Sequence, residues 1–126
     1  MSSIIGIVLA LFGGTEIVYA QEPEEPRVVL IEIETEVQRN ERLVREAFPD
    51  APIMVDIARC ESEFRNVPSE TGDHGVFQIN QIHNERLAQL GLDRTKVEDN
   101  LKFARLLYEE SGTQPWYMSK DTCWGK

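Results

Sequence analysis

A short apolar stripe that ends in a carboxylate is the feature that most constrains the fold of this chain. Met54, Ile57, Glu61 and Phe64 are separated by steps of three, four and three residues, so a helix places all four on one face. That face is otherwise apolar and is expected to point inward. A carboxyl placed there is partly dehydrated, which disfavours its charged form and raises its pKa. Glu61 is therefore predicted to be a general acid that donates a proton near neutral pH.

The spacing alone leaves a second interpretation equally open. Glu61 can instead lie at the edge of the helix, where its carboxylate would pair with Arg59 or Arg65. In that case the charge would be solvated, and the residue would serve only the stability of the helix. The segments that follow in the chain favour the general acid.

The chain is predicted to be mainly α-helical. Thr35 and Gln38 have the spacing of a capping box and open a first helix, which Pro49 ends. Asp50 is expected to cap a second helix, which covers residues 53–64 and carries Glu61 in its final turn.

The composition turns to Pro, Ser, Thr, Gly and Asp between residues 66 and 79, which predicts a turn-rich lobe with one short β-ribbon. Asn80 or Asn84 is expected to cap a third helix that Gly91 ends.

A last helix is predicted over residues 96–110, because Thr95 and Glu98 have a second capping-box spacing. Asn100 and Tyr108 lie on one narrow face of this helix, apart from its apolar packing residues. Such a face can line a cleft.

Four separate blocks, in this order, resemble the lysozyme-like superfamily and, within it, the soluble lytic transglycosylase catalytic domain. The resemblance covers residues 47–124. The blocks are the Glu61-Ser62 pair that closes the helix beginning Ala51-Pro52-Ile53, the run Gly75-Val76-Phe77-Gln78-Ile79-Asn80, the helix from Asn100 to Tyr108, and Gln114-Pro115-Trp116.

The resemblance implies a lysozyme-like fold of about four to five helices, with the short loop and β-ribbon lobe forming one wall of a cleft. It also implies cleavage of the bond between N-acetylmuramic acid and N-acetylglucosamine in peptidoglycan. Glu61 would first protonate that bond and then act as a base on the muramoyl 6-hydroxyl, which yields a 1,6-anhydro product without water.

Eight residues are candidates for contact with the glycan. Hydroxyl and amide side chains read sugar hydroxyls and acetamido groups, and aromatic rings form platforms for sugar faces. The candidates are Ser62, Asp73, Phe77, Gln78, Asn80, Asn100, Tyr108 and Trp116.

Several candidates have plainer alternatives that the sequence leaves open. Gln78 and Asn80 place both amides on one side only if their segment is extended, and Asn80 can simply cap the next helix. Ser62 either orients the carboxyl or the acetamido group, or has no role. Tyr108 can be an ordinary half-buried tyrosine, and Trp116 can fill the core.

Asp73 decides between two reactions. As a second carboxylate it would position a water molecule, and the enzyme would be a hydrolytic muramidase. An aspartate before His74-Gly75 is more typical of an Asx-turn. With Asp73 in a turn, the acetamido group of the substrate would be the nucleophile.

The first 34 residues are expected to lie outside the folded domain of residues 35–126. Residues 1–20 are predicted to be a signal peptide, because the apolar run from Ile4 to Phe12 is too short to span a bilayer. An uncleaved membrane anchor is the runner-up. Residues 21–34 are predicted to be an acidic linker that ends in an edge strand or an extended arm. The protein is therefore expected to be exported, to the periplasm, cell wall or exterior.

Two cysteines, Cys60 and Cys123, suit an exported protein and are predicted to form a disulfide; two free buried thiols are the alternative. A closed loop of about 63 residues would stabilise the fold by roughly 4 kcal/mol in the entropic model. The bond would also tie the tail, with Trp124, across the base of the second helix.

The charge of the chain argues against nucleic acid as a partner. Removal of residues 1–20 leaves 13 basic and 21 acidic side chains, a net charge of −8, whereas phosphate contacts need the opposite sign. His74 and His83 have no metal-ligand spacing with Cys or carboxylates, so we expect no metal and no cofactor. A monomer acting on peptidoglycan strands is the leading hypothesis, with a non-catalytic glycan-binding module and a purely structural helical domain as alternatives.

Overall fold

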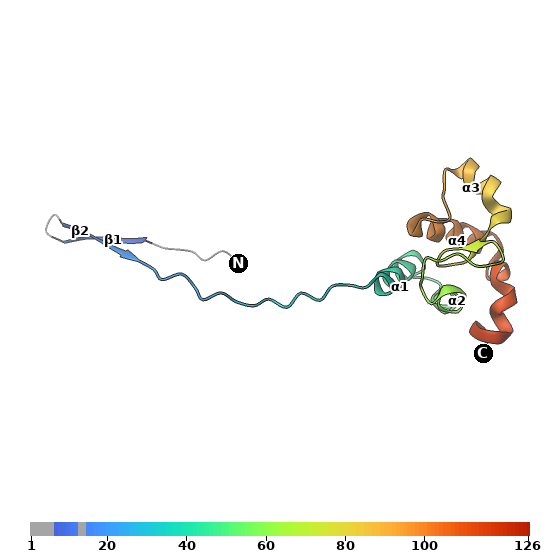
Figure 1. Ribbon diagram of the computed structural model, residues 1–126, viewed down its shortest axis with the longest axis horizontal. Helices are drawn as coiled ribbons and strands as arrows, with labels where there is room; N and C mark the ends of the chain where they lie inside the picture. Colours follow the sequence, from blue (N-terminus) through green and yellow to red (C-terminus); the bar gives the residue numbers. More distant parts are fainter. Residues whose placement is uncertain (1–6, 13–14) are drawn as a thin grey trace. The chain divides into compact units, whose positions relative to one another are not determined.

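The computed structural model describes residues 7–12 and 15–126. The chain divides into two units, Met1–Glu32 and Ile33–Lys126, which are described separately. In the first unit, β1 (Ile7–Phe12) and β2 (Thr15–Ala20) form an antiparallel hairpin in which Ile7 faces Ala20 (Figure 1).

The predicted leader of residues 1–20 lies partly outside the described residues, at positions 1–6 and 13–14. Within the described ranges, no helix is both long enough and apolar enough to cross a bilayer. Export remains a prediction.

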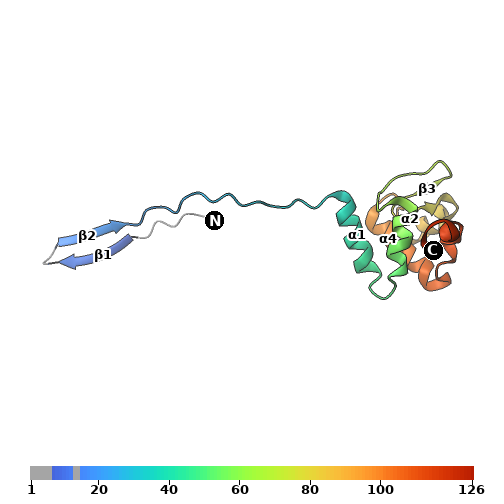
Figure 2. The ribbon, with the colours of Figure 1, turned by 90° about the horizontal axis from the view of Figure 1, so that it is seen from below.

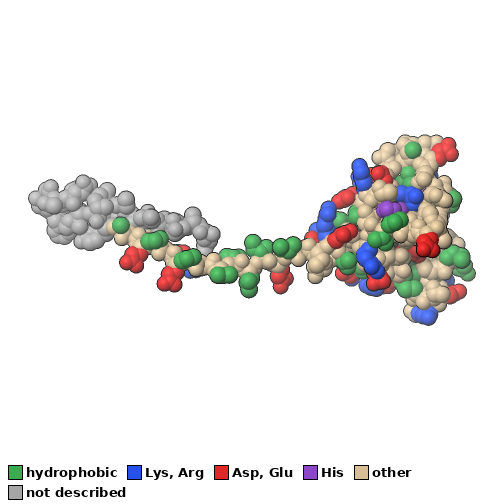
Figure 3. Space-filling view, viewed as in Figure 1, with side chains coloured by type: hydrophobic (Ala, Val, Ile, Leu, Met, Phe, Trp, Pro, Cys, Tyr) green, Lys and Arg blue, Asp and Glu red, His purple; other side chains and the backbone are tan. Residues whose placement is uncertain are grey.

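Residues 21–34 are extended and, within the described chain, pair with no strand (Figure 1). The acidic linker remains a prediction. Its apolar side chains lie in solvent among acidic ones (Figure 3), with Val28, Leu30 and Ile33 between 86 and 91% exposed.

Helix α1 (Glu36–Ala47) begins with the predicted capping box. The Thr35 hydroxyl accepts a hydrogen bond from the Gln38 amide at 3.1 Å, and the Gln38 side chain accepts one from the Thr35 amide at 2.9 Å. Val44 and Phe48 are buried and attach this helix to the core.

Helix α2 (Ile53–Ser62) differs from its prediction at both ends. No side chain caps its N-terminus, so the predicted Asp50 cap is wrong: the Asp50 carboxylate instead accepts two hydrogen bonds from Arg105, at 2.6 and 3.0 Å. The helix ends two residues early because Glu63 and Phe64 adopt left-handed backbone conformations, with φ of 54° and 61°. Phe64 is nevertheless 5% exposed, so its side chain still reaches the core.

The predicted turn-rich lobe contains the expected β-ribbon, β3 (Asp73–His74) paired antiparallel with β4 (Ile79–Asn80). A single 3-10 turn, η1 (Gln81–His83), leads into α3 (Asn84–Leu90). Asn80 caps η1, and Gly91 ends α3 with a φ of 70°, as its residue type indicated. No side chain caps the N-terminus of α3, so the predicted cap of this helix by Asn80 or Asn84 is wrong.

Helix α4 (Val97–Ser111) has the expected extent, but its predicted capping box is wrong. The Thr95 hydroxyl donates to Asp93 at 2.6 Å, and Glu98 pairs with Arg39 of α1 at 2.9 Å. After α4, the chain continues through η2 (Gln114–Ser119) and η3 (Lys120–Trp124).

Helix α2 is central to the second unit: it contacts α1, η2 and η3, while α4 packs against α1 and η2 (Figure 2). Cys60 of α2 and Cys123 of η3 form the predicted disulfide. The unit is therefore mainly helical, as expected. Its largest fully buried hydrophobic side chains are Phe48, Phe77, Phe103, Met54 and Ile57.

The buried side chain of Asn100 joins the turn-rich lobe (residues 66–79), called the ribbon lobe below, to α4. Its side-chain oxygen accepts a hydrogen bond from the Phe77 amide at 3.0 Å, and its side-chain nitrogen donates to the carbonyls of His74 and Arg94, both at 2.8 Å. Gly75 passes so close to this amide that an added Cβ would clash with the Asn100 side-chain nitrogen.

Replacement of Gly75 by alanine is expected to lower the free energy of unfolding by at least about 2 kcal/mol, because strain at a φ of +86° and a clash with Asn100 add together. Gly91→Ala is the matched control: its φ is +70° but nothing lies within 4 Å of the new methyl group, so about 1 kcal/mol is expected. Urea unfolding of both variants measures the difference, and equal losses would contradict the close approach to Asn100.

Candidate functional site

Glu61 lies in the last turn of α2, half-buried. Neither ion pair of the alternative interpretation forms, because Arg59 pairs with Asp56 at 2.8 Å and Arg65 pairs with Glu63 at 3.1 Å. The carboxyl is therefore not a solvated member of a helix-edge salt bridge.

The pKa of Glu61 is raised above its ordinary value of 4.5. The largest cause is burial, which removes water from the charged form; a hydrogen bond from Ser119 acts in the opposite direction, and the negative charge of Asp73 raises the pKa a little further. This direction is the one that the inward-facing position of Glu61 on its helix predicts.

A hollow of about 250 Å³ opens beside Glu61. Its lining comes from the last turn of α2, from residues 63–68 and from Gln78 across the lobe. A larger and more apolar hollow of about 430 Å³ lies between α1 and α4, lined in part by Leu43 and Leu101, but Glu61 does not border it. The smaller one is the candidate site because it brings the predicted acid, Ser62 and Gln78 together.

Ser62 has a structural task that neither interpretation of the sequence anticipated. Its hydroxyl lies 2.8 Å from the carbonyl oxygen of Val76 and 3.3 Å from that of Ala58, so its single hydrogen is used by the backbone. Ser62 thereby holds the last turn of α2, and with it Glu61, against the segment between β3 and β4.

The two amides of the ribbon do not form one sugar-facing row. Gln78 is in a left-handed conformation with a φ of 48°, so the segment is not extended as that row requires. Its side chain donates to the carbonyls of Val67 and Gly75, both at 2.9 Å, while it borders the hollow. Asn80 accepts from the Ile82 amide as the cap of η1, which is its plainer alternative.

Asp73 is engaged within its own loop. Its carboxylate accepts hydrogen bonds from Thr71 at 2.6 Å, Asn80 at 2.9 Å and Ser69 at 3.0 Å. Partial burial alone would raise the pKa of Asp73, but these three bonds and the charge of Arg94 outweigh it, so the pKa is lowered. Asp73 thus stabilises its loop through hydrogen bonds from side chains, rather than through the backbone hydrogen bond of an Asx-turn.

Three other candidates lie inside the protein. Phe77 and Asn100 are fully buried and Trp116 is 4% exposed, which leaves almost no surface for a ligand to touch. The Trp116 indole donates to the Phe77 carbonyl at 2.9 Å, and its ring packs against the Phe77 ring with centroids 5.7 Å apart. Trp116 therefore fills the core, as its alternative interpretation states.

Tyr108 is half-buried and meets the ring of Phe48 edge-on, with centroids 6.0 Å apart. The guanidinium of Arg105 lies 5.8 Å from the centre of its ring. These contacts describe a packing tyrosine of α4.

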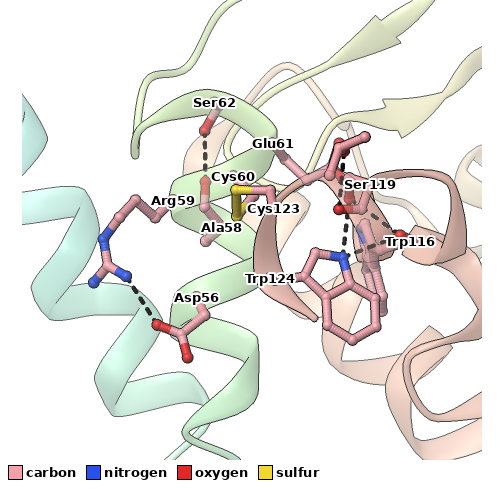
Figure 4. The surroundings of a disulfide bond; sticks show 11 residues. Asp56, Ala58, Arg59, Cys60, Glu61, Ser62, Trp116, Ser119, Cys123 and Trp124 are labelled. Carbon is pink, nitrogen blue, oxygen red and sulfur yellow. Dashed lines mark hydrogen bonds and ion pairs between the residues drawn. A yellow bond between two sulfur atoms is a disulfide. The ribbon is translucent and has the colours of Figure 1, made fainter. Parts of the chain in front are cut away.

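Two residues at the site were missed from the sequence, Ser119 and Trp124. The Ser119 hydroxyl donates to Glu61 Oε1 at 2.5 Å, and the Trp124 indole donates to the Ser119 hydroxyl at 3.0 Å (Figure 4). The available signal was indirect: the predicted bond between Cys60 and Cys123 places the neighbour of one cysteine close to the neighbour of the other.

Among the residues that the structure describes, no group of three or more His, Cys, Asp and Glu side chains is arranged to hold a metal ion. Comparison with known proteins finds no family model, no curated protein and no solved structure that matches the chain.

Glu61→Gln is expected to become more stable relative to the parent protein as the pH rises. The folded state holds the Glu61 proton more tightly than the unfolded state does, so the parent loses stability between pH 4.5 and the raised pKa of Glu61. The amide does not ionise and escapes this loss. The relative gain is expected to stay below about 1 kcal/mol, because solvent screens a half-exposed carboxyl.

Urea unfolding at several pH values between 4 and 8 measures the effect. Glu70→Gln, at an exposed loop position, controls for the loss of one negative charge from an acidic chain. A difference between Glu61→Gln and the parent that stays constant with pH would show that Glu61 is not desolvated in the folded state.

Proposed function

We propose that the protein is a peptidoglycan-cleaving lytic transglycosylase with a lysozyme-like fold, which cuts the β-1,4 bond between N-acetylmuramic acid and N-acetylglucosamine. The observation that carries the proposal is a half-buried carboxyl, Glu61, whose pKa is raised by burial and which borders a hollow. The order of the four sequence blocks supports the same assignment.

In the first step, Glu61 gives its proton to the glycosidic oxygen as the bond from that oxygen to C1 of the muramoyl sugar breaks. The acetamido oxygen of the same sugar bonds to C1, which spreads the positive charge over a cyclic oxazolinium. The leaving sugar departs with a hydroxyl group, and Glu61 is left as a carboxylate.

In the second step, the Glu61 carboxylate removes the proton of the muramoyl 6-hydroxyl. The freed oxygen bonds to C1 while the acetamido oxygen leaves it, which restores the acetamido group and closes the 1,6-anhydro ring. Glu61 ends protonated, as it began, and no water is consumed.

The engagement of Asp73 favours this reaction over hydrolysis. A carboxylate that positions water needs unused acceptor sites, but three of the roughly four sites on Asp73 already accept hydrogen bonds within the loop. With Asp73 largely engaged in this way, we favour the substrate's own acetamido group as the nucleophile.

A glycan-binding module without activity is less well supported. Binding does not need a desolvated carboxyl, and the burial of Glu61 disfavours its charged form without any benefit to a binding site. Proton donation is the use that makes a raised pKa advantageous.

An exported location is part of the proposal. The Cys60–Cys123 disulfide is typical of proteins that fold in an oxidising compartment, where peptidoglycan is also found. Because the chain is acidic, attraction to an anionic cell wall must come from specific sugar contacts at the hollow rather than from long-range steering.

Glu61→Gln is expected to lower turnover of purified peptidoglycan at least about 10²-fold, because it keeps the shape of the side chain and removes the proton donor. Glu70→Gln is the matched control, since it makes the same chemical change at an exposed loop position. Mass spectrometry of the products of the parent protein is expected to show anhydro ends, lighter by one water than reducing ends.

Two outcomes would contradict the proposal. Equal activity of Glu61→Gln and Glu70→Gln would remove Glu61 from the reaction. Reducing ends in the products, lost together with activity in Asp73→Asn, would identify a hydrolytic muramidase in which Asp73 acts on water.

A further inference from the structure

The C-terminal turn, which consists of η2 and η3 (residues 114–124), comes back to the end of α2 and places a hydroxyl against the Glu61 carboxyl. Ser119, the last residue of η2, lies 2.5 Å from Glu61 Oε1 through its Oγ, although 58 residues separate the two in the chain. The disulfide between Cys60 and Cys123 joins α2 to the C-terminal turn close to this contact (Figure 4). Cys60 directly precedes Glu61, and Cys123 directly precedes Trp124.

The hydrogen of Ser119 has a defined destination. A serine hydroxyl carries one hydrogen and two lone pairs. The single N–H of the Trp124 indole is shared between this oxygen at 3.0 Å and the carbonyl of Trp116 at 3.2 Å, so the shorter of its two bonds engages one lone pair of Ser119. The hydrogen then points to Glu61 Oε1 at 2.5 Å or to the carbonyl of Trp116 at 3.1 Å. The contact with Glu61 is the shorter one, and it becomes the stronger one when Glu61 ionises.

We propose that Ser119 is a positioning residue for Glu61 and that Trp124 orients Ser119, so that the C-terminal turn is a working part of the site. This inference rests on the proposed function, in which Glu61 is the acid and base. Ser119 does not touch the substrate in this scheme; it acts through Glu61.

One consequence concerns which oxygen of Glu61 carries the transferable proton. Oε1 accepts the hydrogen of Ser119, so the proton belongs on Oε2. As Glu61 loses that proton, charge develops on the carboxylate and the bond from Ser119 strengthens, since hydrogen bonds to ionised acceptors are the stronger ones. Ser119 thus assists the acid step by stabilising the carboxylate that remains.

None of the charged groups described around Glu61 stabilises its carboxylate as Ser119 does. Asp73 of β3 adds a negative charge that disfavours the carboxylate. Glu63 and Arg65 border the same hollow and pair with each other at 3.1 Å. Ser119 is the neighbour that opposes burial and lowers the pKa of Glu61.

Ser119→Ala in the full-length chain tests the proposal, with the pKa of Glu61 read by NMR of a carbon-13-labelled side-chain carboxyl. The pKa is expected to rise, because burial stays and the donor is lost. Ser119→Thr, which keeps the hydroxyl, is expected to restore the parent pKa. Ser111→Ala removes a hydroxyl from the exposed end of α4 and is expected to leave the pKa unchanged.

The direction of the change separates positioning from mere support of the fold. If Ser119 only held the tail in place, Ser119→Ala would admit water and the pKa of Glu61 would fall. A fall, no change, or a rise that Ser119→Thr fails to reverse would each overturn the proposal. Trp124→Phe keeps a ring and removes the N–H donor, and a smaller rise is expected for it.

Kinetics on peptidoglycan provide the second readout. Ser119→Ala is expected to lower kcat about tenfold with little change in KM, and to move the basic limb of the kcat/KM profile to higher pH. If the parent protein cleaves no peptidoglycan while the NMR result holds, the proposed function fails and the positioning of Glu61 stands. If the parent is active and kcat of Ser119→Ala equals that of the parent, the positioning role fails alone.

Discussion

The buried amide of Asn100 is the contact on which the geometry of the site depends. A fully buried amide without partners would cost a few kcal/mol, but this one bonds to the backbone at two points of the lobe, Phe77 and His74, and at Arg94 before α4. The backbone held in this way offers its carbonyls to the rest of the site: Val76 accepts from Ser62, and Phe77 accepts from Trp116. The helix that carries Glu61 and the turn that carries Ser119 are both fastened to one short segment.

Electrostatics single out Glu61 among the described carboxyls. Glu34, Asp50 and Glu110 each accept hydrogen bonds from an arginine at the surface, and these bonds lower their pKa values. Asp73 is lowered by its loop partners despite partial burial. Glu61 is shifted upward, because burial acts on it more strongly than the one hydroxyl that it accepts from. Ordinary surface pairs stabilise a protein little, whereas a carboxyl kept short of water has a chemical use.

Helix positions were predictable because periodicity and local capping report on neighbours in sequence. The Thr35 capping box and the Gly91 stop involve residues within one turn of each other, and both are present in the structure. The capping predicted for Asp50 and Glu98 is wrong because both carboxylates instead pair with arginines that are far away in the sequence.

At the site, Glu61 was accessible to prediction because its own helix decides which way it faces. The prediction that Asn100 lines a cleft is wrong because an amide binds backbone and sugar by the same hydrogen bonds, and sequence does not tell the two partners apart. Ser119 left no signal at all in the spacing of residues. Its approach to Glu61 arises from the path of the tail, which only the folded chain defines.

That path depends on a covalent bond more than on burial. The η3 turn is largely exposed, including Cys123, and Trp124 is only half-buried, so apolar packing attaches this turn to α2 weakly. The disulfide supplies the missing attachment at the position next to Glu61. In the entropic model the same bond destabilises the unfolded chain by roughly 4 kcal/mol, a large share of the stability of a small domain. The disulfide therefore stabilises the fold and also keeps Trp124 beside Ser119, and Ser119 beside the Glu61 carboxyl. Its position next to Glu61 matters as much as the length of the loop that it closes.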